Sequence, residues 1–169
     1  YEYDGRIFAS ASYRRDASSR FHPDHRWGNF WSVGAAWIIN RESWFNAPVV
    51  NMLKIKASYG SQGNDAIGMY KYTDLYSVTN DGNDGISIMF GAKGNPNITW
   101  ETNANLNIGA EFGLWDDRLS GSLDFFYRKT SDMLFSVPVA PSMGYSSYYS
   151  NIGILHGTLM VHFRYISGN

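Results

Sequence analysis

Two pairs of histidines in this chain have a spacing that could support metal binding. His22 and His25 could share a metal ion, but Pro23 and the turn-forming residues around them supply no helix to align the two imidazoles. No third ligand lies near them, so the spacing favours a solvated loop. His156 and His162 would share one strand face if the C-terminal segment forms a strand. We predict no metal site.

Carboxylates and glycines offer equally little for catalysis. Asp116 and Asp117 could act as a general acid and base, but beside a predicted tight turn aspartate is a turn former that stays hydrated. Gly60, Gly63 and Gly68 do not form a phosphate-binding loop, because no helix follows to present its N-terminus. No arrangement of Ser, His and Asp has support. We therefore predict no catalytic residue, no cofactor and no enzymatic activity.

The elements that must position the polar residues are strands, and the segment from Trp100 to Thr130 is the clearest. Apolar side chains alternate with polar, asparagine-rich ones up to Leu114, and the pattern restarts at Leu119. Two such runs joined by a turn of about four residues predict one long antiparallel hairpin. Because strands of soluble domains usually end near five or six residues, a hairpin of this length fits a wall between lipid and water.

Other segments repeat the period of two. Alternating runs extend over Arg6 to Arg14, Phe30 to Ile39, Leu53 to Gly60 and Leu155 to Tyr165. Two short pieces, Tyr70 to Val78 and Ile86 to Phe90, are expected to pair as a small hairpin. The region from Ser131 to Ser150 carries Pro138 and Pro141, and prolines interrupt ladders, so we expect a loop or a strand edge there.

The connections between these runs alternate in length. Residues 15–28, 61–99 and 131–150 are long connections, residues 115–118 are a short one, and residues 40–52 are intermediate. Transmembrane β-barrels have short periplasmic turns, long external loops and aromatic girdles that would explain the aromatic residues at the strand ends. We predict an all-β, antiparallel transmembrane β-barrel segment of about eight strands of a larger barrel. The alternative is a soluble β-sandwich with the same residues in its core.

The composition agrees with β-structure. The 169 residues are 17% aromatic and include 17 Gly, which favours strands and turns over helices. A net charge of −1 gives no electrostatic footprint for nucleic acid, and the absence of Cys excludes disulfides. No segment approaches the roughly 18 apolar residues of a membrane-spanning helix. The chain opens at Tyr1 without a leader pattern, which we interpret as a piece of something longer.

Two groups of polar residues remain as candidate sites. The polar side of the predicted wall would line a wet lumen, where amides suit sugar hydroxyls and water equally well; its residues are Lys54, Lys56, Asn103, Asn105, Asn107 and Glu111. A candidate external-loop signature consists of Arg14, Arg15, Asp16, Ser18, Ser19, Arg20 and Phe21. This signature could touch cargo or order the barrel mouth. It could also be an Arg–Asp network that fixes the loop's shape, which is the interpretation we favour.

Five sequence blocks occur in an informative order. They are RRDASSRF (Arg14 to Phe21), WGNFWSVGAAWIINRE (Trp27 to Glu42), LKIKASYGSQGN (Leu53 to Asn64), NPNITWETNANLNIGAEFGLWDDRLSGSLDFFYRKTSDML (Asn95 to Leu134) and NIG (Asn151 to Gly153). Each block alone is weak, but together they resemble the SusC/RagA family of TonB-linked outer-membrane transporters of Bacteroidetes-type bacteria.

The resemblance implies a large closed barrel with an N-terminal plug in the outer membrane of a Gram-negative bacterium. Such a protein imports oligosaccharides or peptides by TonB-driven transport, with a SusD-like lipoprotein as its lid and lipid around its wall. The resemblance assigns the turn at Asp116 and Asp117 to the periplasmic side. Residues 1–153 would be part of the barrel. Residues 154–169 depart from the family's pattern, which a truncated or frameshifted reading frame would explain.

A segment with two unpaired edges in lipid would leave costly unsatisfied backbone groups, so we predict that the isolated chain transports nothing. Two alternatives stay open. One is a complete eight-stranded outer-membrane barrel, which is feasible at this length. The other is a soluble β-sandwich that binds carbohydrate through exposed Trp and Tyr.

Overall fold

The computed structural model describes residues 1–80, 82, 85–157 and 160–167, and strands make up most of it. The strands are β1 (Glu2–Tyr3), β2 (Ile7–Ala17), β3 (Trp27–Ile38), β4 (Val50–Asn64), β5 (Leu75–Asn80), β6 (Ile86–Ala92), β7 (Glu101–Leu114), β8 (Leu119–Pro138), β9 (Ser147–His156) and β10 (Met160–Ser167). Two short 3-10 helices are η1 (Ile39–Arg41) and η2 (Pro141–Met143). Within the described ranges, no helix is long and apolar enough to cross a membrane.

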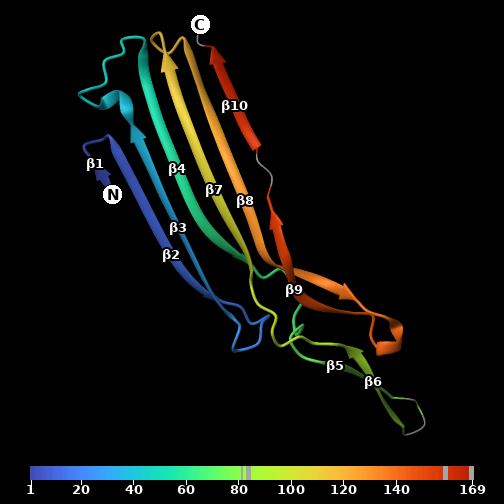
Figure 1. The fold of residues 1–169 in the computed structure, drawn as a ribbon. Helices are drawn as coiled ribbons and strands as arrows, with labels where there is room; N and C mark the ends of the chain where they lie inside the picture. The colour runs from blue at the N-terminus through green and yellow to red at the C-terminus, as the bar shows by residue number, and fades with distance from the viewer. Residues whose placement is uncertain (81, 83–84, 158–159, 168–169) are drawn as a thin grey trace.

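One antiparallel sheet contains most of the strands. Eight strands pair in the order β1-β2-β3-β4-β7-β8-β10, and β9 pairs with β8 as well. The strands β9 and β10 therefore follow one another along the same side of β8 (Figure 1). The ends of this sheet do not meet, so the prediction of an open barrel segment is confirmed. The alternative of a complete eight-stranded barrel is wrong.

The predicted long hairpin is strands β7 and β8. Their register runs without a break from the pair Thr102–Ser131 to the pair Leu114–Leu119. The turn between them holds Trp115, Asp116 and Asp117 in left-handed backbone conformations, with φ of 53°, 55° and 62°. Aspartate tolerates this conformation better than most residues. The hairpin and its tight turn are therefore as the alternation predicts.

The sheet separates an apolar face from a polar face. Cross-strand register places the alternating large apolar side chains on one side, where they stay exposed; among them are Val33, Trp37, Ile55, Tyr59, Ile108 and Leu123. A β-sandwich would cover such a face with a second sheet. The second sheet here contains only β5 and β6, which pair with each other. The sandwich alternative is therefore not supported.

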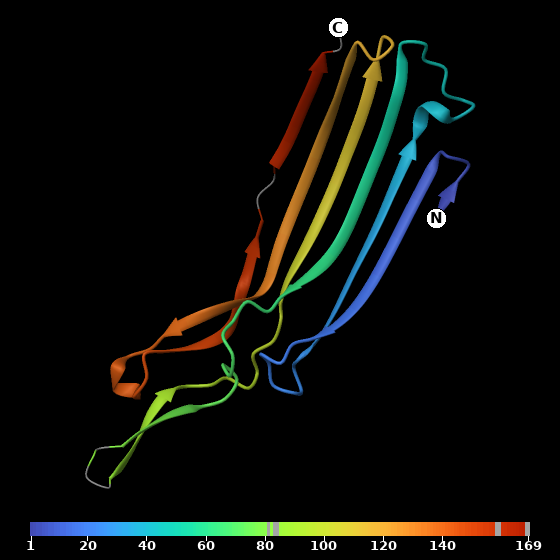
Figure 2. The same ribbon diagram turned by 180° about the vertical axis from the view of Figure 1, so that it is seen from behind.

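The connections gather at two ends of the sheet. Residues 18–26, 65–100 and 139–146 lie at one end, which we call the loop end (Figures 1 and 2). Residues 39–49 and 115–118 lie at the opposite end, which we call the turn end. The longest connection, residues 65–100, lies at the loop end and the short turn, residues 115–118, at the turn end, as the sequence predicts; residues 39–49 at the turn end are nevertheless longer than residues 18–26 and 139–146. The small hairpin β5–β6 projects from the loop end, close to its predicted position in the sequence.

Most of the fully buried side chains lie at the loop end. Phe21 and Ile98 are 0% exposed and Ile67 is 6% exposed, and these three form one cluster. Trp100 packs its ring against Phe21 at 5.5 Å between ring centroids. The loops are therefore held together by a small core of their own, whereas the wall buries little.

Several boundaries differ from the sequence-based expectations; β4, for example, extends beyond the expected run Leu53 to Gly60 at both ends. Residues 15–17 continue β2, because Arg15, Asp16 and Ala17 pair with residues at the start of β3. Residues 131–138 and 147–150 are strands of a hairpin, so the expected loop was wrong; the alternative of a strand edge agrees with Pro138, which is the last residue of β8. The C-terminal alternation is split between β9 and β10 instead of forming one strand. Whether residues 154–169 diverge from a family pattern stays a prediction.

Candidate functional site

The candidate lumen residues lie together on the polar face. In the register of β4 and β7, Lys54 pairs with Glu111 and Ser58 pairs with Asn107. In the register of β7 and β8, Asn103 pairs with Thr130 and Asn105 with Arg128. Because each pair shares one side of the pleat, the six predicted residues, which are on β4 and β7, lie in one polar strip that their partners on β8 extend. Their contact with a lumen or with cargo stays a prediction.

A charged network crosses this strip near the turn end. The Glu111 carboxylate accepts hydrogen bonds from Lys54 Nζ at 3.4 Å and Lys56 Nζ at 2.8 Å. Lys56 also forms an ion pair with Asp124 on β8 at 3.1 Å. The network therefore contains two cations and two anions on three strands. Sequence reasoning placed Asp124 on the polar face but missed its role, because the pairing depends on the register of β7 and β8.

Gly109 makes this pairing possible. It lies on β7 between Lys56 and Asp124, and it faces both in the register. A Cβ atom at Gly109 would overlap the Asp124 carboxylate and the end of the Lys56 side chain. Because Gly109 has no side chain, Lys56 can reach Asp124 directly across β7.

An asparagine ladder extends the strip toward the loop end. Thr130 Oγ1 donates to Asn103 Oδ1 at 2.6 Å, and Arg128 Nε donates to Asn105 Oδ1 at 2.8 Å. Asn107 Nδ2 donates to Ser58 Oγ at 3.4 Å. Each of these side-chain amides is therefore oriented by a residue on an adjacent strand. The side of the sheet on which the amides lie remains uncovered in the part of the chain that the structure describes.

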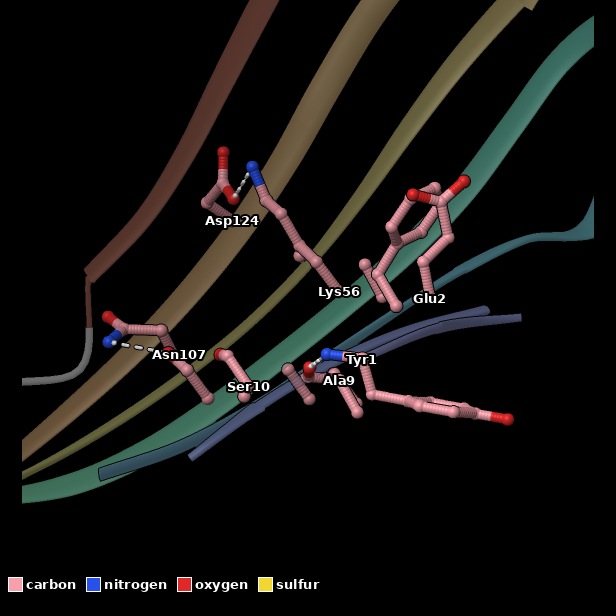
Figure 3. Close-up of a pocket in the computed structure, with 14 residues that line it drawn as sticks. Tyr1, Glu2, Ala9, Ser10, Lys56, Asn107 and Asp124 are labelled. Atoms are coloured by element: carbon pink, nitrogen blue, oxygen red, sulfur yellow. Dashed lines mark hydrogen bonds and ion pairs between the residues drawn. The ribbon is translucent and has the colours of Figure 1, made fainter. Parts of the chain in front are cut away.

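The polar face is hollowed where its side chains are small. A concavity of about 820 Å³ has Ser10, Gly34 and Ser58 in its floor, and Lys56 and Asp124 beside it. In Figure 3 the Lys56 ammonium group points toward Asp124, and Ser10 is among the other labelled residues that line the concavity. The volume falls in the range of sites that hold small molecules. A polar partner could therefore approach the backbone closely here.

The predicted external-loop signature is divided between two places. Ser18 and Arg20 are at the loop end, where Ser18 Oγ donates to Asp65 Oδ2 at 2.7 Å and Arg20 donates to the Asp65 carbonyl at 2.8 Å. Phe21 is buried in the loop core, and Ser19 between them is exposed. Asp65, which the sequence did not single out, is thus the partner that holds this segment to the loop after β4.

Arg14 is in β2, as the alternation from Arg6 to Arg14 predicts, whereas the expectation of a loop from Arg15 onward was wrong, because Arg15 and Asp16 are in this strand as well. Arg14 forms an ion pair with Asp16 at 2.6 Å, because residues two apart share a strand face. Arg15 points to the other face, where its guanidinium lies 4.7 Å from the centre of the Trp27 ring. The signature thus contains the pair Arg14–Asp16 within β2 and, through Arg20, a second pair with Asp65. Whether these pairs act as a network that fixes the loop's shape stays a prediction.

Asn151 is a second residue that sequence reasoning missed as a contact. Its amide group forms a bidentate pair with the backbone of Thr99, accepting from Thr99 N and donating to Thr99 O, each at 2.9 Å. It also donates to the carbonyl of Asp132 at 2.8 Å. Asn151 of β9 therefore connects the segment before β7 to β8 through its side chain. The NIG block was the only sequence signal that pointed to it.

No metal-binding cluster forms among the described residues. Within the ranges that the structure describes, no three His, Cys, Asp or Glu side chains come close enough to hold a metal ion. His22 contacts its neighbour Asp24 at 3.3 Å and the ring of Tyr72 at 6.0 Å. The side chains of His156 and His162 lie outside the described structure. The expected absence of a metal site and of catalysis stays a prediction.

The sequence matches one family model over most of its length. Residues 1–157 match the family described as TonB dependent receptor-like, beta-barrel. The TonB-dependent receptor P26 of Formosa agariphila is 34% identical over 159 residues, which is 92% of this chain and 16% of that protein. The TonB-dependent receptor SusC of Bacteroides thetaiotaomicron is 32% identical over 164 residues, again 92% of this chain and 16% of that protein.

Solved structures agree with this family. The RagAB peptide importer in its closed-closed state matches with a TM-score of 0.83 and 35% identity, over 90% of this chain and 17% of that one. The open-open state of the same importer matches with a TM-score of 0.80 and 35% identity, over 91% and 17%. The chain therefore spans about one sixth of the length of the proteins that it resembles.

Proposed function

We infer a role in transport from one premise: this chain belongs to the TonB-dependent receptor-like β-barrel family. We propose that it forms part of the wall and the external loops of an outer-membrane importer in the intact protein. Matched proteins of this kind include a receptor named SusC and a peptide importer. Oligosaccharides and peptides are accordingly the cargo classes that we propose.

One observation carries this proposal above all. A single sheet exposes an apolar face and a polar face, and the polar face is an oriented strip of amides and ion pairs. Such a sheet is stable where one face meets hydrocarbon and the other meets water, which is the environment of a barrel wall. The apolar face would contact lipid, and Lys54, Lys56 and Glu111 would face the water-filled lumen.

The orientation follows from the two ends of the sheet. Barrels of outer membranes carry their long loops outside and their short turns in the periplasm. The loop end, with its own core around Phe21, would therefore be external. The turn at Asp116 and Asp117 would be periplasmic. In this orientation a SusD-like lipoprotein would cover the loop end, and a plug elsewhere in the protein would couple transport to TonB.

Uptake measurements in the native host test this function. Deleting the gene for the intact receptor should abolish uptake of at least one ligand in a panel of labelled oligosaccharides and peptides. Deleting the gene for TonB should abolish uptake of the same ligand. Undiminished uptake of every ligand in the receptor deletion strain would contradict the proposal. Co-purification of a SusD-like lipoprotein with the tagged receptor tests the proposed lid separately.

The chain by itself should not transport. The unpaired strand edges would expose backbone polar groups to hydrocarbon, where each costs several kcal/mol. Liposomes that contain only these residues should therefore show the same swelling rate in oligosaccharide solutions as empty liposomes. Swelling above that background would contradict this part of the proposal.

A further inference from the structure

A small cleft lies between two hairpins at the loop end. The hairpin β5–β6 and the tip of the hairpin β8–β9 approach one another there in both views (Figures 1 and 2). Phe90 of β6 and Tyr145 of the β8–β9 tip make an edge-on ring contact at 5.9 Å. The cleft has a volume of about 100 Å³ and is lined by residues from three segments, around Lys71, Lys93 and Tyr149.

Backbone contacts fix the shape of this cleft. Asn95 donates from its backbone N–H to the Lys71 carbonyl at 3.0 Å. Its side-chain Nδ2 donates to the Tyr149 carbonyl, also at 3.0 Å. Gly94 lies so close to the backbone of Thr73 that a Cβ atom would overlap it. The walls of the cleft are therefore held by hydrogen bonds and close packing before any ligand arrives, which lowers the entropic cost of binding.

The cleft carries an uncompensated positive charge. Lys93 forms an ion pair with Asp74 at 3.0 Å. Lys71 is half-buried, and its Nζ lies 5.2 Å from the centre of the Tyr149 ring. Over the part of the chain that the structure describes, no carboxylate lies within ion-pair distance of Lys71. A lysine held in place by a ring rather than by an acid is available to an anionic ligand.

We propose that this cleft binds a carboxylate group of an acidic oligosaccharide, with Lys71 supplying the charge. The Tyr149 ring lies against the Lys71 ammonium group. Ser146 and Ser147 are among the residues that line the cleft, and serine can hydrogen-bond to sugar hydroxyls. Four tyrosines are also among the lining residues, and a tyrosine side chain, with an apolar ring and a polar hydroxyl, suits the faces and hydroxyls of sugars.

The size of the cleft limits what it can hold. At about 100 Å³ it is smaller than the usual 300–1,000 Å³ of sites for whole small molecules. It therefore accepts one carboxylate and the edge of one sugar ring, while the rest of the chain stays outside. This inference deepens the proposed function and rests on it, because cargo must pass the loop end to enter an importer.

Binding to the intact receptor in detergent tests the inference with three probes of equal length: trigalacturonate, neutral galactotriose and triglutamate. The wild-type receptor should bind trigalacturonate most tightly. Lys71→Gln should weaken that binding about tenfold, which is the factor for one hydrogen bond to a charged group, and should reduce its salt dependence. Lys71→Arg, which keeps the charge, should restore most of the affinity. Arg118→Gln, with the same charge change at the turn end, is the control.

The following outcomes would contradict the inference. Equal binding of trigalacturonate and galactotriose would exclude the carboxylate, and tighter binding of triglutamate would assign the cleft to peptides. An equal loss for all three probes in Lys71→Gln would indicate a structural role for this lysine. Uptake of neutral cargo is measured separately in the same variants. If the uptake of neutral cargo is normal and trigalacturonate binding does not depend on Lys71, the proposed carboxylate site is wrong but the proposed transport function stands.

Discussion

Lys56 on β4 and Asp124 on β8 form an ion pair at 3.1 Å, although a complete strand lies between them. The pair passes over Gly109 of that strand, β7. Lys56 also donates to Glu111 at 2.8 Å, so one ammonium group connects three strands. The polar face is thereby cross-linked perpendicular to the strands, in addition to its backbone ladder.

We expect Gly109→Ala to destabilise the wall of the intact receptor by about 1–3 kcal/mol, the usual cost of overpacking. The new methyl group would overlap the Asp124 carboxylate and displace Lys56. The measurement is the temperature at which the folded band is lost in heat-modifiable gel migration. Gly34→Ala on the same face is the control, because its nearest neighbour is the rotatable hydroxyl of Ser10 at 3.1 Å. Equal stability of both variants would contradict the role of Gly109.

We expect Asp65→Ala to loosen the segment that carries Ser18 and Arg20. The substitution removes the acceptor of the Ser18 hydroxyl and the ion pair to Arg20 at 3.7 Å. A lost hydrogen bond to a charged group costs about 1.5–3 kcal/mol, so protease cleavage within residues 18–26 should become faster. Asp24→Ala is the control, since the Asp24 side chain is 79% exposed. Faster cleavage in both variants would show that the contacts of Asp65 are not what protects the loop.

The wall was predictable from sequence because its signal is local. Residues two apart on a strand share a face, so Lys54, Lys56 and Asn107 could be assigned to the polar side without knowing their partners. The long strands and the tight turn at Asp116 follow from the same period and from turn chemistry. The pairings between strands, such as Lys56 with Asp124 and Asn105 with Arg128, required the cross-strand register.

The loop end was not predictable in the same way. Asp65 and Ser18 are 47 positions apart, and Asn151 and Thr99 are 52 apart, so no periodic pattern connects them. The strand beyond Ser131 was missed because Pro138 indicated an interruption. In the structure this proline ends β8 opposite Ser147, where the missing N–H costs little.

We expect Asn151→Asp to release the β8–β9 extension from the segment before β7. The Nδ2 group donates to the carbonyls of Thr99 and Asp132, and a carboxylate would repel both. Hydrogen–deuterium exchange of peptides from residues 133–150 should become faster by an order of magnitude or more, as one to two lost hydrogen bonds imply. Asn97→Asp, at an exposed position in the same connection, is the control. Unchanged exchange in Asn151→Asp would contradict the role of this amide.

The base of the β5–β6 hairpin should depend on pH through Asp74. The Gly94 N–H donates to its carboxylate at 2.8 Å and Lys93 lies at 3.0 Å, and these contacts lower the pKa of Asp74 below its ordinary 3.8. A carboxyl group whose pKa is depressed on folding stabilises the fold above its ordinary pKa and loses that effect as the pH falls through the folded value. Exchange of peptides around Gly94, corrected for intrinsic rates, should therefore be slow from pH 7 down to about pH 4 and faster below it. Asp74→Asn should exchange at a rate that changes little over this range, and a pH profile identical to wild type would contradict the assignment to Asp74.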